Sequence, residues 1–404
     1  MKNNTKLNLE FAGTECTFWA TNGIIFNFAA VFLQYKGYSN YKLGIILAAS
    51  NIVGFLLQPL IAGYIDRHNK KPLLKSVALV ALLSLVSAIA AACIPSVCPL
   101  LSVAYVLVLA TSILLQPLTN SMCKYLNTWG YEVKFARARA AGSLGFALCM
   151  VILGALTVSI SPMVVPASYV IILAMLILII LLLMRQDKTI RLVPPKVFDN
   201  KAKAANPLPV FIRNNRRFCV YLIGIAMLFF SHSLLGNFMI EFLRPIGGNS
   251  GDMGNIFCIM ALSELPAMLL FDRLLIRFRC SALIKISAVM FVVKQAAAWA
   301  ASSVPMMYVA MCIQALSFAV FIPASVRYVD EVIKKRDSVK GQACTTSMFT
   351  LGSVFASYFG GYMLDTLSIP NTLMVGTIVA AAGALIIIPS VEKTKLAEQK
   401  KSTV

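Results

Sequence analysis

The feature of this sequence that most constrains its fold is a series of long apolar stretches, which recur about every 30 residues. A stretch near 20 residues, coiled with a rise of about 1.5 Å per residue, is long enough to cross a hydrocarbon layer of roughly 30 Å. Of the 404 residues, 59% are hydrophobic and only 13% are charged, a composition that does not suit a water-soluble surface. The sequence therefore predicts an integral membrane protein.

The expected fold is all-α, with twelve transmembrane helices in two similar halves of six. The apolar stretches place helix boundaries to within about four residues. The expected spans are residues 10–34, 42–65, 72–94, 99–121, 137–160, 163–184, 218–243, 251–272, 281–302, 304–327, 341–363 and 369–390.

A polar, proline-broken stretch at residues 185–217 interrupts the apolar pattern in the middle of the chain. It is rich in Lys and Arg and has no apolar periodicity, which is typical of an exposed linker. We therefore expect an N-terminal six-helix bundle at 1–184, a cytoplasmic central loop at 185–217, a C-terminal six-helix bundle at 218–390 and a cytoplasmic tail at 391–404.

The net charge of +20 follows from 36 Lys and Arg against 16 Asp and Glu. Nearly all of the cations fall in the termini and in one set of loops, whereas the opposite loops hold only Lys36, Lys42 and Arg244. Positive charge resists translocation, so this asymmetry predicts that both termini are cytoplasmic, in the inner (plasma) membrane of the cell. We interpret the charge as a topology signal and expect no nucleic-acid partner.

Several classes of protein are disfavoured. The short loops on the weakly charged side leave no room for an extracellular domain, which argues against a receptor. An enzyme would need clustered nucleophiles, bases or metal ligands, but the chain has only two His, and its ten Cys follow no metal-binding spacing. No phosphate-binding loop for ATP is present. We expect no catalytic residue, no metal and no cofactor, and a disulfide between Cys93 and Cys98 stays open as the less favoured alternative to free thiols.

The stretch QPLIAGYIDRHNKKPL lies between the second and third expected spans and places a carboxylate beside cations at a helix end. Such a turn can hold neighbouring helices in one of two arrangements, or act only as a topology signal. It resembles the motif that joins helices 2 and 3 of the major facilitator superfamily, although Ala62 and Asn69 replace two glycines. A similar turn begins at Phe271. The residues that we expect to act in gating are Asp66, Arg67, Lys70 and Lys71.

Within that superfamily the chain resembles the oligosaccharide–proton symporters (lactose permease-like) and the phenylpropionate and nucleoside permeases. Three stretches carry this resemblance: GIILAASNIVGFLLQPL from Gly44, FARARAAGSLGFALCMVILG from Phe135 and MALSELPAMLL from Met260. The resemblance implies two six-helix bundles around a central cavity that opens alternately to each side.

Charged residues inside apolar spans are expensive and are therefore functional candidates, with a static pair between helices as the alternative. In the first half, Glu15 and Arg139 lie about 7–8 Å from the cytoplasmic ends of their spans at about 1.5 Å per residue, which permits an ion pair. By resemblance, Arg139 matches a sugar-contacting arginine and Phe146 matches an aromatic residue that stacks on the sugar. The partner carboxylate of that group is missing near Asn120, and Glu15 is the candidate counter-charge. Asn22 and Asn120 complete the expected polar groups for a solute.

In the second half, Glu264 and Lys294 match a buried glutamate and arginine of the resembling group, and His232 lies at similar depth. A desolvated Glu beside Lys, with His in reach, is suited to exchange a proton, although a static pair is the alternative. The His and Glu of the resembling group's helix 10 have no counterpart here, where Gln314, Ser317 and Val320 stand. We expect Glu264, His232 and Glu15 to couple protons and Lys294 to contact the solute.

These observations predict a secondary active transporter that takes up a small organic solute, such as a sugar or oligosaccharide, with a co-transported proton. The alternative is uptake or efflux of an aromatic or amphipathic compound or a nucleoside. The expected partners are the solute, the proton and the lipid bilayer, and the protein is expected to be a monomer.

Overall fold

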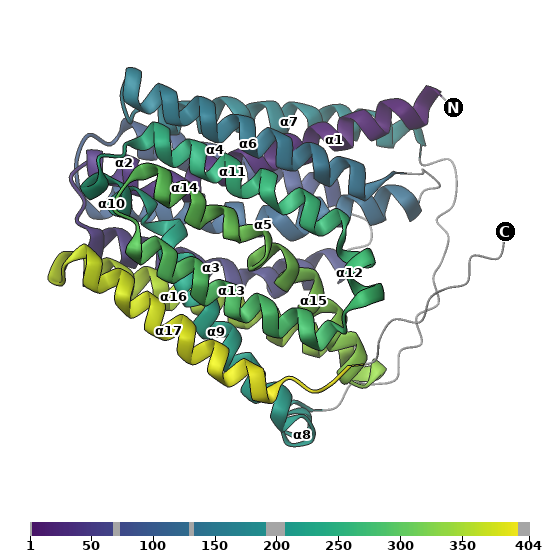
Figure 1. Ribbon diagram of the computed structural model, residues 1–404. Helices are drawn as coiled ribbons and strands as arrows, with labels where there is room; N and C mark the ends of the chain where they lie inside the picture. The colour runs from purple at the N-terminus through teal and green to yellow at the C-terminus, as the bar shows by residue number, and fades with distance from the viewer. Residues whose placement is uncertain (1, 68–72, 129–132, 191–206, 395–404) are drawn as a thin grey trace. The chain divides into compact units, whose positions relative to one another are not determined.

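The computed structural model describes residues 2–67, 73–128, 133–190 and 207–394, in which every regular element is a helix (Figure 1). The first half contains α1 (Lys2–Asn27), α2 (Ala29–Tyr35), α3 (Asn40–Arg67), α4 (Leu73–Cys93), α5 (Pro99–Thr128), α6 (Phe135–Ser159) and α7 (Val164–Ile190). The second half contains α8 (Leu208–Asn214), α9 (Arg216–Asn237), α10 (Met239–Leu243), η1 (Arg244–Ile246), α11 (Ser250–Leu269), α12 (Phe271–Arg277), α13 (Cys280–Ala300), α14 (Val304–Cys312), η2 (Ile313–Ala315), α15 (Phe318–Val332), η3 (Lys335–Asp337), α16 (Ser338–Thr366) and α17 (Ile369–Ser390).

These helices fall on the twelve expected spans. By length and composition, nine helices in the described ranges can cross a membrane, or eleven if each of two bent pairs is counted as one span. The remaining expected span, residues 341–363, coincides with α16, which is 29 residues long. Glycine, serine and threonine lower the mean hydropathy of α16, so its length rather than its hydropathy indicates that it can span a membrane.

Four of the expected spans contain a break, a feature that the expected ranges do not include. α1 and α2 meet at a bend of 49°, and the Ser250–Ala267 part of α11 meets α12 at 51°. α9 is followed directly by the short helix α10, and a 3₁₀ turn separates α14 from α15. Apolar periodicity does not reveal such breaks because each half of a broken span keeps the same composition.

The stretch expected to be a loop, residues 185–217, is partly helical. α7 continues to Ile190, and α8 forms a short helix in which Phe211 is buried against Phe218. The polar composition of the stretch does not predict this helix, because among the described side chains of α8 only Phe211 is buried in the core. The division into bundles at this stretch stays a prediction.

The chain forms two compact units. Unit 1 comprises Met1–Asp199, Asn237–Ile240 and Gly248–Ala261, and unit 2 comprises Asn200–Gly236, Glu241–Gly247 and Leu262–Val404. In unit 1, α1 packs against α6 and α7, and α5 packs against α3 and α4. In unit 2, α13 packs against α15 and α17. The core of unit 2 is strongly aromatic and includes Phe218, Tyr221, Phe321 and Tyr328.

Candidate functional site

A hydrogen-bonded network of four side chains lies inside unit 2. Its centre is Lys294 on α13, which is 1% exposed. The Lys294 Nζ lies 3.1 Å from Nδ1 of His232 on α9 and donates to Oε1 of Gln314 at 2.8 Å. An ammonium group has donors but no acceptor, so a charged Lys294 requires Nδ1 of His232 to be the acceptor.

Gln314 extends the network to a carboxylate on another helix. Its Nε2 donates to Oε1 of Glu264, on α11, at 2.9 Å. The amide therefore uses its acceptor on the cation and its donor on the anion, which is the orientation that both charges favour. The sequence predicts that Glu264, Lys294 and His232 lie at similar depth, and in the structure Lys294 contacts His232 directly and is connected to Glu264 through Gln314. In the sequence, Gln314 is one of the residues that stand where the resembling group has its helix 10 His and Glu.

A break in a membrane-spanning helix positions Gln314. α14 ends at Cys312, and the 3₁₀ turn η2 closes with Leu316 N–H donating to the carbonyl of Ile313 at 3.0 Å. Ser317, the residue before α15, has φ −85° and ψ −86°, outside the helical region. Interrupted helices at membrane depth are common where transporters bind solutes or ions.

Aromatic rings surround the imidazole end of the network. His232 is stacked on Phe318, the first residue of α15, with ring centroids 4.7 Å apart and planes at 17°. Phe291 and Phe229 make T-shaped contacts with the imidazole at centroid distances of 6.0 and 5.9 Å. The same helix break thus places an amide on Lys294 and a ring on His232.

A second polar cluster lies in unit 1, where α1 meets α6. Trp19 Nε1 donates to Oε2 of Glu15 at 3.1 Å, and the Arg139 guanidinium carbon lies 3.8 Å from the Trp19 ring centroid. Arg139 Nη1 also donates to Oγ of Ser143 at 3.0 Å. The indole of Trp19 therefore contacts both Glu15 and Arg139, and the ion pair expected between these two charges stays a prediction.

Glycines on α6 allow this close approach. A Cβ at Gly142 would lie 2.6 Å from Cδ1 of Trp19, and one at Gly145 would lie 2.3 Å from Sγ of Cys16. Glu15 is fully buried, and its Oε1 has no hydrogen-bond partner within the described ranges. A buried carboxylate oxygen without a partner is costly, which makes Glu15 a candidate for protonation during function.

The other predicted solute contacts are placed as follows. Phe146 lies against α1, because a Cβ at Gly23 would be 2.7 Å from its ring. It therefore shares with Arg139 the face of α6 that meets α1. Asn22 Nδ2 lies 3.4 Å from Oγ of Ser112 on α5, and Asn120 is an exposed residue of α5. The solute-binding role of these residues stays a prediction.

The predicted gating turn lies largely outside the residues that the structure describes. α3 ends at Arg67, so Asp66 and Arg67 form its last residues, but their side chains fall outside the described part of the chain, as do Lys70 and Lys71. Their role in gating stays a prediction. Cys93 and Cys98 are free thiols, so the alternative of a disulfide between them is wrong.

Long apolar helices that carry hydrogen-bonded charges in their interior, with a side chain from a helix break contacting two of these charges, are typical of a polytopic membrane transporter. More specifically, the chain belongs to the MFS_1 like family, whose model matches residues 12–374. It is thus a transporter of the major facilitator superfamily and not an enzyme, which confirms the predicted resemblance and fold class.

Known relatives and solved structures agree with this assignment. The chain is similar to the maltose permease of Geobacillus stearothermophilus, with 24% identity over 385 residues that cover 94% of this chain and 93% of the permease. It is also 24% identical over 176 residues to the uncharacterized transporter YwbF of Bacillus subtilis (strain 168), covering 42% of this chain and 43% of that protein.

Among solved structures, a mutant of the nucleoside transporter NupG has a TM-score of 0.81 at 14% identity and covers 96% of this chain and 100% of its own. A bacterial homolog of the human lysosomal transporter Spinster, inward-facing and unoccupied, has a TM-score of 0.72 at 13% identity, with coverages of 96% and 97%. At these identities the likeness establishes the fold.

Proposed function

We propose that this protein takes up a small organic solute, such as a sugar or oligosaccharide, together with a proton by alternating access. The observation that carries this proposal is the network of Glu264, Gln314, Lys294 and His232. When Glu264 binds a proton, its hydrogen bond from Gln314 loses the assistance of a full negative charge. Lys294 is then less compensated, so proton binding favours a different arrangement of these helices.

Similarity to a maltose permease over 94% of the chain supports a sugar as the solute. We assign solute binding in unit 1 to Arg139, Phe146, Asn22 and Asn120, because guanidinium and amide groups bond hydroxyls and a phenyl ring offers an apolar face. In unit 2, Lys294 is the proposed solute contact. Proton coupling is assigned to Glu264 with His232, and Glu15 is the alternative site for the coupled proton.

A nucleoside or another solute with a planar ring is the second candidate. The ring of Phe318, which stacks on His232 and is only partly buried, favours it, because aromatic side chains stack on planar ligands. The fold is also that of the nucleoside transporter NupG.

The proposed orientation places both termini in the cytoplasm and the protein as a monomer in the inner membrane. Two of the few cations on the opposite side have local partners. Lys36 donates to the carbonyls of Ala92 and Ile94 near the end of α4, and Arg244 pairs with Glu241. In this orientation Asp66, Arg67, Lys70 and Lys71 lie at the cytoplasmic rim, and Asp66→Asn is expected to slow transport while affinity stays near wild type.

Two experiments test the proposal. A thermal-stability screen of the purified protein against sugars, nucleosides and aromatic acids identifies the solute, since a ligand that binds the folded state raises the melting temperature. Uptake of that solute into proteoliposomes is then measured with and without an imposed pH gradient. Gradient-driven accumulation is the expected result. Equal uptake under both conditions contradicts proton coupling, and stabilisation by aromatic acids alone contradicts the sugar assignment.

A further inference from the structure

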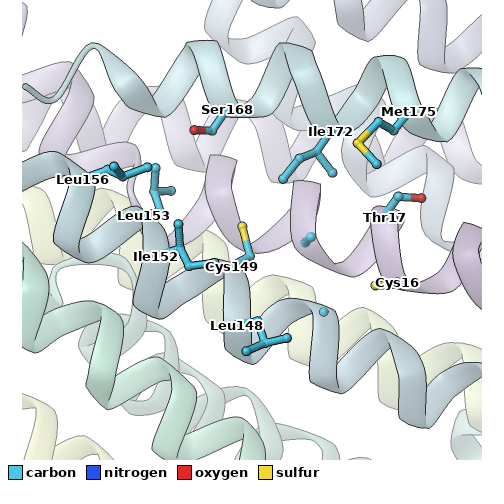
Figure 2. Close-up of a pocket in the computed structure, with 12 residues that line it drawn as sticks. Cys16, Thr17, Leu148, Cys149, Ile152, Leu153, Leu156, Ser168, Ile172 and Met175 are labelled. Atoms are coloured by element: carbon cyan, nitrogen blue, oxygen red, sulfur yellow. The ribbon is translucent and has the colours of Figure 1, made fainter. Parts of the chain in front are cut away.

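An apolar groove of about 310 Å³ lies in unit 1 between α1, α6 and α7. Figure 2 shows Ile172 and Met175 of α7 approaching it from one side and Leu148 and Ile152 of α6 from the other. The groove is open at its edge, since Leu148 is 64% exposed.

A similar groove of about 370 Å³ lies in unit 2 between α9, α16 and α17. Its lining includes Phe230 of α9, Phe355 and Phe359 of α16, and Val379 of α17, and none of its lining side chains carries a polar group. Phe355 and Phe359 are both exposed residues.

The two grooves occupy equivalent places in the two units. α1, α6 and α7 are the first, fifth and sixth spans of unit 1, and α9, α16 and α17 hold the same order in unit 2. Close backbone approach occurs beside both grooves, because a Cβ at Gly145 would meet Cys16 and one at Gly352 would lie 2.4 Å from the carbonyl oxygen of Ala226. Such recurrence in two differing sequences indicates a feature of the fold rather than an accident of packing.

The dimensions and chemistry of the grooves fit a hydrocarbon chain. From Leu148 to Leu156 α6 rises about 12 Å, and from Met348 to Phe359 α16 rises about 16 Å, at about 1.5 Å per residue. One leaflet of the bilayer contributes about 15 Å of hydrocarbon, half of roughly 30 Å. In the unit 1 groove, the hydrogen of the Thr17 hydroxyl already has an acceptor within α1, because it is donated to the carbonyl of Gly13 at 2.8 Å.

The unit 1 groove also lies on the side of α6 opposite to its contact with α11. Gly154 of α6 lies against Gly254 of α11. The groove residues Ile152 and Leu156 are each two positions from Gly154 along α6, which at about 3.6 residues per turn is a rotation of about 200° around the helix. This side of α6 is therefore not covered by α11.

From these observations we infer that each groove holds one acyl chain of a membrane phospholipid, lying along the helix axes. The phospholipid is a resident partner of each unit, separate from the transported solute. Bound chains fill space beside the first span of each unit and stabilise its packing against the fifth and sixth spans.

Filling each groove with a ring tests this inference. The test variants are Ile172→Trp and Val379→Trp, which place an indole ring in the unit 1 and unit 2 grooves. The control variants are Ile171→Trp and Ile378→Trp, at adjacent residues that are 61% and 58% exposed and line neither groove. Protein extracted from phosphatidylcholine–phosphatidylglycerol vesicles is examined by native mass spectrometry. Each groove variant is expected to retain one phospholipid fewer than wild type, the double variant two fewer, and the control variants as many as wild type.

Equal phospholipid retention by groove and control variants overturns the inference. Ile172→Phe and Val379→Phe serve if a tryptophan prevents folding, with the melting temperature as the measure of folding. Addition of the transported solute is expected to leave the lipid count unchanged, and displacement of phospholipid by the solute would place the grooves in the transport pathway and contradict the inference.

Discussion

Gln314 donates a hydrogen bond from its side-chain amide to the carboxylate of Glu264 at 2.9 Å. The acceptor of the same amide is occupied by Lys294 at 2.8 Å. A neutral side chain from a broken helix therefore joins a carboxylate on α11 to an ammonium on α13. Any movement of the break changes the surroundings of both charges together.

Replacing Gln314 by Met keeps the volume and removes both hydrogen bonds. We expect loss of proton-driven accumulation and a fall in stability of about 1–3 kcal/mol, because two charged groups lose a partner in a buried site. Proteoliposome uptake and thermal unfolding of the purified protein measure the two effects.

Gln295→Met is the matched control for Gln314→Met. Gln295 is also fully buried, but neither polar atom of its side chain has a hydrogen-bond partner in the described ranges. Its removal is expected to leave accumulation intact and stability unchanged or higher. Equal behaviour of the two variants would show that Gln314 has no special role.

Glu264→Gln is expected to abolish uphill accumulation while sparing exchange of solute across the membrane. The amide keeps the size of the carboxylate and cannot carry the coupled proton. Uptake under an imposed pH gradient and counterflow without one separate these two activities. If Glu264→Gln still accumulates solute and Glu15→Gln does not, the proton site lies in unit 1 and the assignment to Glu264 is wrong.

Arg139→Lys is expected to weaken solute binding about tenfold, equivalent to about 1.4 kcal/mol. Lysine keeps the charge but loses both the planar stack on Trp19 and the forked donors of the guanidinium. Phe146→Ala is expected to weaken binding as well. Ligand titration of the purified protein measures both effects.

The control for Arg139→Lys is Arg137→Lys, which changes an exposed arginine two residues earlier on α6. It is expected to bind as wild type does. Wild-type affinity in both Arg139→Lys and Phe146→Ala would remove these residues from the solute site.

The buried charges could be found from the sequence because they stand out in apolar spans. The pattern singles out Glu15, Arg139, Glu264 and Lys294, and depth along each span predicts which of them lie at the same level of the membrane. In the structure the two charges of each unit contact a common side chain, which is Trp19 in unit 1 and Gln314 in unit 2.

The side chains that connect these charges could not be found in the same way. Trp19 is an apolar residue by composition, and only the close approach of α1 to α6 puts its ring on Arg139 and its N–H on Glu15. Gln314 is one of several neutral polar residues in the spans. Its role depends on the turn η2, and a break in a helix leaves no signal in hydropathy.

Gly142→Ala tests the approach of α1 to α6 that builds the unit 1 cluster. The added Cβ would lie 2.6 Å from Trp19 and 3.2 Å from the carbonyl oxygen of Glu15, so the ring or the helix must shift. We expect a loss of stability of about 1–3 kcal/mol from overpacking, and weaker solute binding because the indole no longer supports Arg139.

Gly236→Ala is the control, since a Cβ there meets nothing within 4 Å. Without a clash, alanine in a helix is expected to be neutral or to stabilise by up to about 1 kcal/mol. Thermal unfolding and ligand titration of both variants measure these effects, and wild-type values for Gly142→Ala would mean that the contact between Trp19 and α6 is not required for the site.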